Sequence, residues 1–515
     1  MKKTLFILGV ILFQLNCFSQ PSIQWQKTVG GSFDDFGFNI HETVDKGFIV
    51  AGITNSNDGD VTGNQGDYDC WVVKLNSQGT IQWQKTLGGS AEDYAFSVLQ
   101  VADGGYIVAG MTNSNNGDVT ENHGNYDCWI VKLDAIGAIV WQKTFGGSFD
   151  DAALSIKETT DGGYIVAGYT SSEDGDVSGN HGETDFWVLK LNETGKIQWQ
   201  KTLGGSAGDY ASSIEQTADG GYILAGETAS LDEDVTYNHG SYDFWVVKLS
   251  VIGTIQWQKT FGGSNIDEAQ SIQQSADGGY IVAGNTNSAD GDVNGYHGSF
   301  DYWIVKLDPT GAIQWQKALG GIRDDKATCI QQSSDGGYIV AGWTYSIDGD
   351  VIRNNGDYDY VGNDYWVVKL NGTGMILWQK ALGGFDDDVA TSIQQTKDGG
   401  YIVAGWTYLS EGYLTKNQKS YDYLIVKMDA GSLSTCSFLQ ERIVIYPNPA
   451  KSILNLQFPD DMLIDKIIII DLTGQIIMEQ SKNTKQINTE GLASGMYLIQ
   501  VISGEKKWQS DFLVE

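Results

Sequence analysis

Basic residues are scarce in this chain of 515 residues, which has 32 Lys and Arg residues against 65 Asp and Glu residues. The formal net charge is therefore −33 at pH 7. Nucleic-acid phosphates require a basic surface, so we expect no nucleic-acid partner. The same charge disfavours contact with anionic lipid unless a divalent cation bridges the two.

Cysteines are few, and their number is odd. Of the five, Cys70 and Cys128 occupy equivalent positions in neighbouring repeats, and Cys329 and Cys436 match no pairing pattern. The sequence therefore predicts no disulfide framework.

Apolar runs long enough to span a bilayer are also lacking, so we expect no transmembrane segment. The run 5–13 follows two lysines and precedes Cys17-Phe18-Ser19, where small residues stand at the positions that a signal peptidase reads. We predict a signal peptide over residues 1–19. Acylation of Cys17 is the less favoured alternative, because the residues before it are a poor match to a lipoprotein signal.

Common catalytic motifs are missing. The chain has no Gly-x-Ser-x-Gly elbow, no phosphate-binding loop and no histidines at metal-ligand spacing. A glycoside hydrolase needs only two suitably separated carboxylates, so these absences leave that class open.

What the chain has in abundance is repetition. The run GGYIVAG at Gly399–Gly405 has six earlier near-copies, which begin at residues 46, 104, 162, 220, 278 and 336. The spacing is 58 residues except in the last interval, where it is 63. Seven copies at this period indicate a radial or stacked architecture, in which one copy alone cannot bury its apolar face.

Each repeat contains four strand-like runs joined by short turns or one long polar loop, which is the pattern of a propeller blade. The chain begins with a fourth-strand run at residues 23–28, and the seventh repeat lacks one. We therefore expect residues 23–28 to pair with 422–428. The sequence predicts an all-β, seven-bladed β-propeller over residues 20–430; a solenoid would need polar caps that are absent.

Four recurrent segments, Leu-Gly-Gly-Ser, Asp-Gly-Gly-Tyr-Ile-Val-Ala-Gly, Trp-Val-Val-Lys-Leu-Asn and Gly-x-Ile-Gln-Trp, give the repeats a family likeness. Together they resemble the seven-bladed propeller repeats of secreted bacterial proteins over residues 23–429. The resemblance implies a fold and says almost nothing about activity, because propellers support binding, scaffolding and catalysis alike.

A polar linker at 431–442 leads to a second domain at 443–515. Its segments 446–450, 467–475 and 492–498 resemble the C-terminal sorting domain of type IX (Por) secretion substrates in Bacteroidetes, type A. That resemblance implies a β-sandwich, recognition by the type IX machinery, and secretion to the medium or the outer-membrane cell surface. The chain ends without the basic residues usual in the family, which weakens the case for anchoring.

Two aspartates occur in every repeat and have two interpretations. They could form a ring that binds cations, or they could accept hydrogen bonds from backbone amides of their own turns, which we favour. The tryptophans that recur in the third and fourth strand-like runs of the repeats are expected to pack between blades. The first set is Asp35, Asp93, Asp151, Asp209, Asp267, Asp325 and Asp388, and the second is Asp69, Asp127, Asp185, Asp243, Asp301, Asp364 and Asp422.

The long loop of each repeat carries Asp-Gly-Asp or a variant of it, as at Asp58–Asp60. Clustered carboxylates beside a glycine turn make calcium a candidate cofactor, although no copy has the full EF-hand spacing. Four loop histidines, one per repeat, are expected to have a local loop role.

The residue after Ala-Gly varies from repeat to repeat and is aromatic in the sixth and seventh. Aromatic planes beside carboxylates suit sugar rings, although these side chains could instead cover the base of a longer loop. The candidate ligand-binding residues are Trp343, Tyr345, Tyr358, Tyr360, Trp406 and Tyr408.

We therefore expect a secreted or cell-surface propeller that acts as a non-catalytic binding module for extracellular polysaccharide or a surface partner. Two alternatives remain: a carbohydrate-active enzyme resembling an endoglucanase, and a purely structural surface protein.

Overall fold

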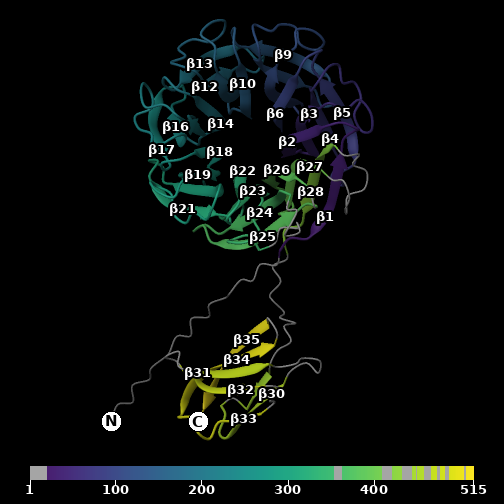
Figure 1. The fold of residues 1–515 in the computed structure, drawn as a ribbon. Coiled ribbons are helices and arrows are strands. Elements are labelled where there is room, and N and C mark those ends of the chain that lie inside the picture. Colours follow the sequence, from purple (N-terminus) through teal and green to yellow (C-terminus); the bar gives the residue numbers. More distant parts are fainter. Residues whose placement is uncertain are drawn as a thin grey trace, which may run out of the picture. The chain divides into compact units, whose positions relative to one another are not determined.

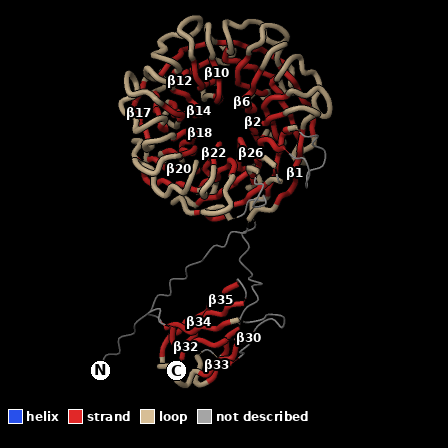
Figure 2. The backbone as a smooth tube through the Cα atoms, in the orientation of Figure 1, coloured by secondary structure: helices blue, strands red, loops and turns tan. Residues whose placement is uncertain are grey.

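A computed structural model describes residues 20–352, 362–384, 386–408, 420–431, 444–447, 449–457, 465–471, 476–481, 486–503 and 506–514. They fall into two separate units, one within residues 20–431 and one within 444–514. All regular elements are strands (Figure 2). The predicted signal peptide at 1–19 lies outside the described residues.

Within residues 20–431, the strands form seven four-stranded antiparallel sheets around a common centre (Figure 1). We number the sheets 1 to 7 in the chain order of their innermost strands. From the centre outward they are: sheet 1, β2 (Asp35–Glu42), β3 (Phe48–Thr54), β4 (Asp69–Leu75), β5 (Ile81–Leu87); sheet 2, β6 (Asp93–Gln100), β7 (Tyr106–Thr112), β8 (Asp127–Leu133), β9 (Ile139–Phe145); sheet 3, β10 (Asp151–Glu158), β11 (Tyr164–Thr170), β12 (Asp185–Leu191), β13 (Ile197–Leu203); sheet 4, β14 (Asp209–Gln216), β15 (Tyr222–Thr228), β16 (Asp243–Leu249), β17 (Ile255–Phe261); sheet 5, β18 (Asp267–Gln274), β19 (Tyr280–Thr286), β20 (Asp301–Leu307), β21 (Ile313–Leu319); sheet 6, β22 (Asp325–Gln332), β23 (Tyr338–Thr344), β24 (Asp364–Leu370), β25 (Ile376–Leu382); sheet 7, β26 (Asp388–Gln395), β27 (Tyr401–Tyr408), β28 (Tyr421–Met428), β1 (Ile23–Val29).

Sheet 7 combines the two ends of this unit. Strand β1 pairs antiparallel with β28, in a register that places Ile23 opposite Met428 and Val29 opposite Tyr423. The predicted pairing of residues 23–28 with 422–428 is therefore present. It gives β28, which would otherwise be an exposed edge, a hydrogen-bonded neighbour.

The apolar core lies between sheets rather than within any one of them. Ile107 and Ile130 of sheet 2, for example, pack with Val166 and Trp187 of sheet 3. Second strands are built of small and branched residues because both of their faces are covered, and the third strands are buried along their whole length. One sheet alone would expose these faces to water, so neighbouring sheets stabilise one another.

The repeated tryptophans pack between sheets, as predicted. Trp71 of sheet 1 is fully buried, and its ring centroid lies 4.6 Å from that of Tyr423 in sheet 7. Trp83 of sheet 1 packs on Tyr106 of sheet 2 at 5.5 Å. Each of these indoles therefore packs against the neighbouring sheet.

The C-terminal unit consists of two small sheets that share one apolar core. Leu454, Ile467, Ile499 and Phe512 contribute to that core from both sheets. The first sheet is β29 (Val444–Tyr446), β30 (Ile453–Gln457), β33 (Gln486–Asn488), and the second is β32 (Ile476–Ser481), β31 (Lys466–Asp471), β34 (Gly495–Ser503), β35 (Lys506–Val514).

Candidate functional site

The predicted aromatic residues that the structure describes lie on two neighbouring sheets, 6 and 7. Trp343 is half-buried on β23, and Tyr345 lies just beyond that strand under the Arg323 guanidinium, which is 4.9 Å from the ring centroid. No ring contact joins Trp343 to Trp406 within the described residues. Tyr358 and Tyr360 lie outside the described residues.

Trp406 and Tyr408 do enter an aromatic cluster, at the junction of sheets 7 and 1. Trp406 meets Phe36 edge to face at 5.5 Å and Tyr421 at 5.0 Å. Tyr421 also contacts Phe36 at 4.9 Å and Tyr408 at 5.0 Å. We call Phe36, Trp406, Tyr408 and Tyr421 the aromatic cluster; all four side chains are half-buried.

Acidic residues adjoin the aromatic cluster. The backbone N–H of Tyr421 donates to Asp34 Oδ1 at 3.2 Å, and the N–H of Tyr408 donates to the Asp387 carbonyl at 2.8 Å. Burial, followed by the charges of Asp387 and Asp34, raises the pKa of Tyr421. The cluster therefore presents neutral aromatic rings beside carboxylates.

Sequence reasoning missed Phe36 and Tyr421 because their contacts join the first sheet to the last. One signal was available: Tyr421 immediately precedes a repeated aspartate, and Tyr68, Tyr126 and Tyr242 occupy the same position in other repeats. Because β1 belongs to sheet 7 and leads directly into β2 of sheet 1, these two sheets are neighbours.

The repeated aspartates hold the turns of the sheets, as the favoured interpretation predicted. Asp35 Oδ2 accepts hydrogen bonds from the Gly31 N–H at 2.8 Å and the Ser56 hydroxyl at 3.0 Å. Asp422 of sheet 7 lies close by, and a Cβ added at Gly30 would sit 2.5 Å from Asp422 Oδ1 and 2.6 Å from Asp35 Oδ2. Only glycine leaves room for both carboxylates at this junction.

Burial changes the protonation of these aspartates. It raises the pKa of Asp35 to about 6 despite hydrogen bonds that lower it, and it raises that of Asp422 to about 7. The pKa of Asp388 rises to about 8, again chiefly through burial. All three side chains are at most 5% exposed, so they are inaccessible to a substrate.

The long loops are held by their own carboxylates and histidines. Asp58 Oδ1 accepts the Ser32 N–H at 2.8 Å, and His181 Nδ1 in the long loop of sheet 3 lies 2.6 Å from Oδ2 of Asp185, the first residue of β12. In the described part of the chain, no three His, Cys, Asp or Glu side chains are grouped so as to hold a metal ion. Calcium binding in these loops stays a prediction.

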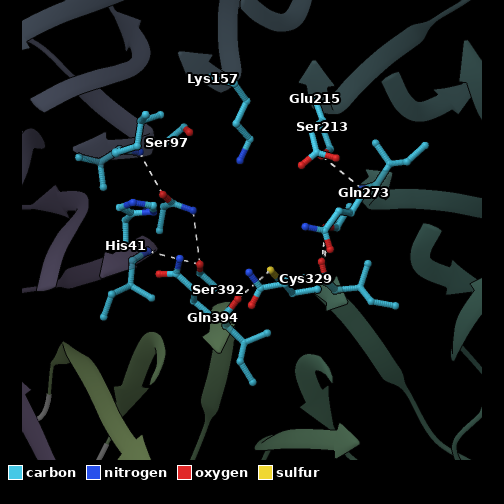
Figure 3. A pocket seen from close by; sticks show the side chains of 18 residues that line it. His41, Ser97, Lys157, Ser213, Glu215, Gln273, Cys329, Ser392 and Gln394 are labelled. Atoms are coloured by element: carbon cyan, nitrogen blue, oxygen red, sulfur yellow. Dashed lines mark hydrogen bonds between the residues drawn. The ribbon is translucent and has the colours of Figure 1, made fainter. Parts of the chain in front are cut away.

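A cavity of about 190 Å³ lies at the centre of sheets 1 to 7, and every innermost strand contributes to its lining (Figure 3). We call this cavity the lumen. The fifth residue of each innermost strand is Ser, except for Asn39 and Cys329. Its side-chain oxygen accepts a backbone N–H of the next sheet, as where Ser271 accepts from Ile330 at 3.2 Å. Cys329 instead donates its thiol to the Ile393 carbonyl at 3.6 Å.

The seventh residue of each innermost strand also lines the lumen, and it varies. Four of these residues accept a backbone N–H of the following sheet through a side-chain oxygen at 2.6 to 2.7 Å: Glu215, Gln273, Gln331 and Gln394. The other three, in sheets 1 to 3, make no such bond: His41, Leu99 and Lys157. The lumen therefore has one repetitive sector and one specialised sector.

Electrostatics in the specialised sector favour uncharged His41. Burial first, and then the charges of Lys157 and Lys397, lower the pKa of His41 to about 4. Burial also raises the pKa of Glu215. At neutral pH, His41 therefore offers one ring nitrogen as an acceptor and the other as a donor.

The C-terminal unit belongs to a recognisable class of domain. Residues 444–515 match the model of the secretion system C-terminal sorting domain. This domain indicates secretion through the type IX system to the cell surface or outside. No helix among the described residues is long and apolar enough to cross a membrane.

Similarity over the repeats is more distant. The chain is 22% identical over 393 residues to the regulatory protein FlaEY of Caulobacter vibrioides; the match covers 66% of this chain and spans only 39% of that protein. Among solved structures, PorZ, described as an essential bacterial surface component of the type IX secretion system of Porphyromonas gingivalis, is 11% identical with a TM-score of 0.30, covering 92% of this chain and 69% of its own. A puromycin hydrolase is 11% identical with a TM-score of 0.45, covering 84% and 61% of the two chains.

Proposed function

We propose that this protein is a surface-exposed binding module for extracellular polysaccharide, built as a closed seven-bladed propeller and exported by its sorting domain. The sorting-domain match supports export, and the seven sheets with β1 paired to β28 support the closed ring. In this proposal, residues 20–430 form the propeller, 431–442 the linker and 443–515 the sorting domain.

The aromatic cluster is the observation that carries the proposal. Four half-buried rings from sheets 1 and 7 lie within 5.5 Å of a neighbouring ring and adjoin the Asp34 carboxylate. Rings of this kind supply apolar area at low entropic cost, and a carboxylate accepts hydrogen bonds from hydroxyl groups. A sugar offers both an apolar C–H face and hydroxyl donors, so it matches the two features together.

Repetition supports binding without catalysis. A hydrolase needs two carboxylates that reach the substrate, one of them with a raised pKa. The aspartates with raised pKa values described above are buried and recur in every sheet, where they accept hydrogen bonds from their own turns. Their burial suits a role in the fold.

The test is to mix the full chain with a panel of soluble and insoluble polysaccharides, and to measure protein depletion and released reducing ends. We expect depletion without released ends. Replacing Trp406 and Tyr421 by Ala should weaken binding at least about tenfold, because each ring contributes about 1 kcal/mol or more.

Phe149→Ala is the matched control, because Phe149 is a 55% exposed aromatic residue in the sheet 3 loop equivalent to the one beside the cluster. Equal losses in the control and the cluster variant would place binding elsewhere. Released reducing ends would favour a glycoside hydrolase instead, and no depletion on any glycan would favour a structural role or a protein partner.

A further inference from the structure

In the specialised sector of the lumen, the seventh residues of the innermost strands lack a hydrogen bond that the seventh residues of the other sheets make. In sheets 4 to 7, the seventh residue of the innermost strand accepts a backbone N–H of the next sheet. His41, Leu99 and Lys157 forgo this bond, which is worth about 1 kcal/mol. The absence of this bond in three neighbouring sheets indicates that these three side chains have a role in the lumen itself.

Lys157 is the most distinctive of the three. Its side chain extends into the lumen from β10 and is exposed there, so solvent reaches it (Figure 3). Among the described residues, no hydrogen bond or ion pair joins its ammonium group to a partner. The lysines of the third strands are paired instead: Lys74, for example, is nearly buried and bonds Asp45 at 3.0 Å.

Amide donors line the opposite side of the lumen. Gln331 and Gln394 each turn the amide oxygen toward a backbone N–H, at 2.6 and 2.7 Å respectively. That contact fixes the orientation of the amide and leaves its NH2 group available as a donor. In Figure 3, Gln394 lies across the cavity from Lys157. An ammonium group and two amides thus offer donors to one small space.

The volume of the lumen indicates the size of a molecule that would fill it. A cavity of about 150 Å³ accommodates benzene, so the 190 Å³ of the lumen suits a molecule of roughly six to eight non-hydrogen atoms. A carboxylate would accept from the Lys157 ammonium group, because charge-assisted hydrogen bonds are the strong ones. Glu215 and neutral His41, on the walls beside Lys157, can accept from a hydroxyl group of the same molecule.

We propose that the lumen is a binding site for a small organic hydroxy acid, whose carboxylate is held by Lys157. The site is separate from the aromatic cluster and does not depend on polysaccharide binding.

Calorimetric titration of the full chain with lactate, and with neutral propane-1,2-diol, tests the proposal. We expect lactate to bind and the diol to bind at least tenfold more weakly. Lys157→Gln should weaken lactate binding at least tenfold, and Lys143→Gln, on the exposed outer strand of sheet 2, should leave it unchanged. Equal binding of lactate and diol, no binding of either, or unaltered lactate affinity in Lys157→Gln would overturn the proposal.

Two further arms keep the test decisive. Glutamine occupies the equivalent position in three sheets and leucine in one, so Lys157→Leu replaces Lys157→Gln if the latter shows a lowered melting temperature. Inorganic phosphate is titrated in parallel. Phosphate binding as tight as that of lactate, with the same loss in Lys157→Gln, would show a general anion site and overturn the assignment to an organic acid.

Discussion

The first and seventh residues of the innermost strands line the same ring but follow opposite rules. The first is aspartate in all seven sheets, where it is buried and bonds the turn of its own sheet. The seventh faces the lumen and includes His, Leu, Lys, Glu and Gln. A residue that completes its own sheet must be repeated with it, whereas a residue that faces the shared centre can differ from its neighbours.

The largest expected effect comes from breaking the repeated position. Asp209 accepts the Gly205 N–H and the Ser230 hydroxyl, both at 2.8 Å. Asp209→Ala leaves both donors buried and unpaired, and should lower the free energy of unfolding by about 2–4 kcal/mol. Urea titration followed by tryptophan fluorescence measures this. Asp209→Asn, which keeps one acceptor oxygen, should cost less; equal losses would show that the hydrogen bonds are not the source.

Acidification should stabilise the folded state, again through the first residues of the innermost strands. Burial raises the pKa of Asp35 and of Asp151 to about 6 and that of Asp388 to about 8, so the folded state binds protons that the unfolded state releases above about pH 4. Their contribution is complete below pH 4 and is lost as the pH rises through 6 to 8. Calorimetry should show a higher melting temperature at pH 5 than at pH 8, at constant ionic strength. The reverse order would contradict the raised pKa values.

A smaller effect is expected from placing glutamine, the residue found in three other sheets, at the seventh position of sheet 2. Leu99→Gln would supply the acceptor that Gln331 supplies in sheet 6 at 2.6 Å, here for the Glu158 N–H. We expect a gain of about 0.5–1 kcal/mol in the free energy of unfolding. Gln331→Leu is the reciprocal variant and should lose a similar amount. If both variants destabilise the chain equally, lumen packing rather than the intersheet bond controls stability.

The smallest effect is expected at the fifth position, where Cys329 stands in place of serine. Cys329→Ser would let a hydroxyl oxygen accept the Ile393 N–H, as Ser271 does for Ile330 at 3.2 Å. The expected gain in the free energy of unfolding is at most about 0.5–1 kcal/mol. Urea titration of this variant beside Leu99→Gln compares the two. A loss above 1 kcal/mol would show that the thiol fits its site better than a hydroxyl.

Much of the fold could be predicted because the repeat constrains it. Strand order within each sheet, the pairing of residues 23–28 with 422–428, and the turn-holding aspartates all follow from comparing copies of one sequence segment. These features depend on local sequence and on the order of the runs, and both are visible without coordinates.

The site could be predicted only in part, because its contacts are not local. Trp406 and Tyr408 could be named from the sequence, but the rings they contact, Tyr421 of their own sheet and, for Trp406, Phe36 of sheet 1, could not. The lumen could not be predicted because its residues come one per repeat and are far apart in the sequence. Seven side chains that converge from separate sheets leave no motif along the chain.

The pairing of β1 with β28 also determines when sheet 7 can form during synthesis of the chain. Strand β1 is the earliest part of the ring to be synthesised and its partner is the latest, about 400 residues on. Bringing such distant strands together costs little more than joining nearer ones, since each doubling of the loop adds only about 0.6 kcal/mol. A chain truncated before β28 would nevertheless hold β1 with no partner. Sheet 7 can therefore be completed only after the strands of the other six sheets have been synthesised.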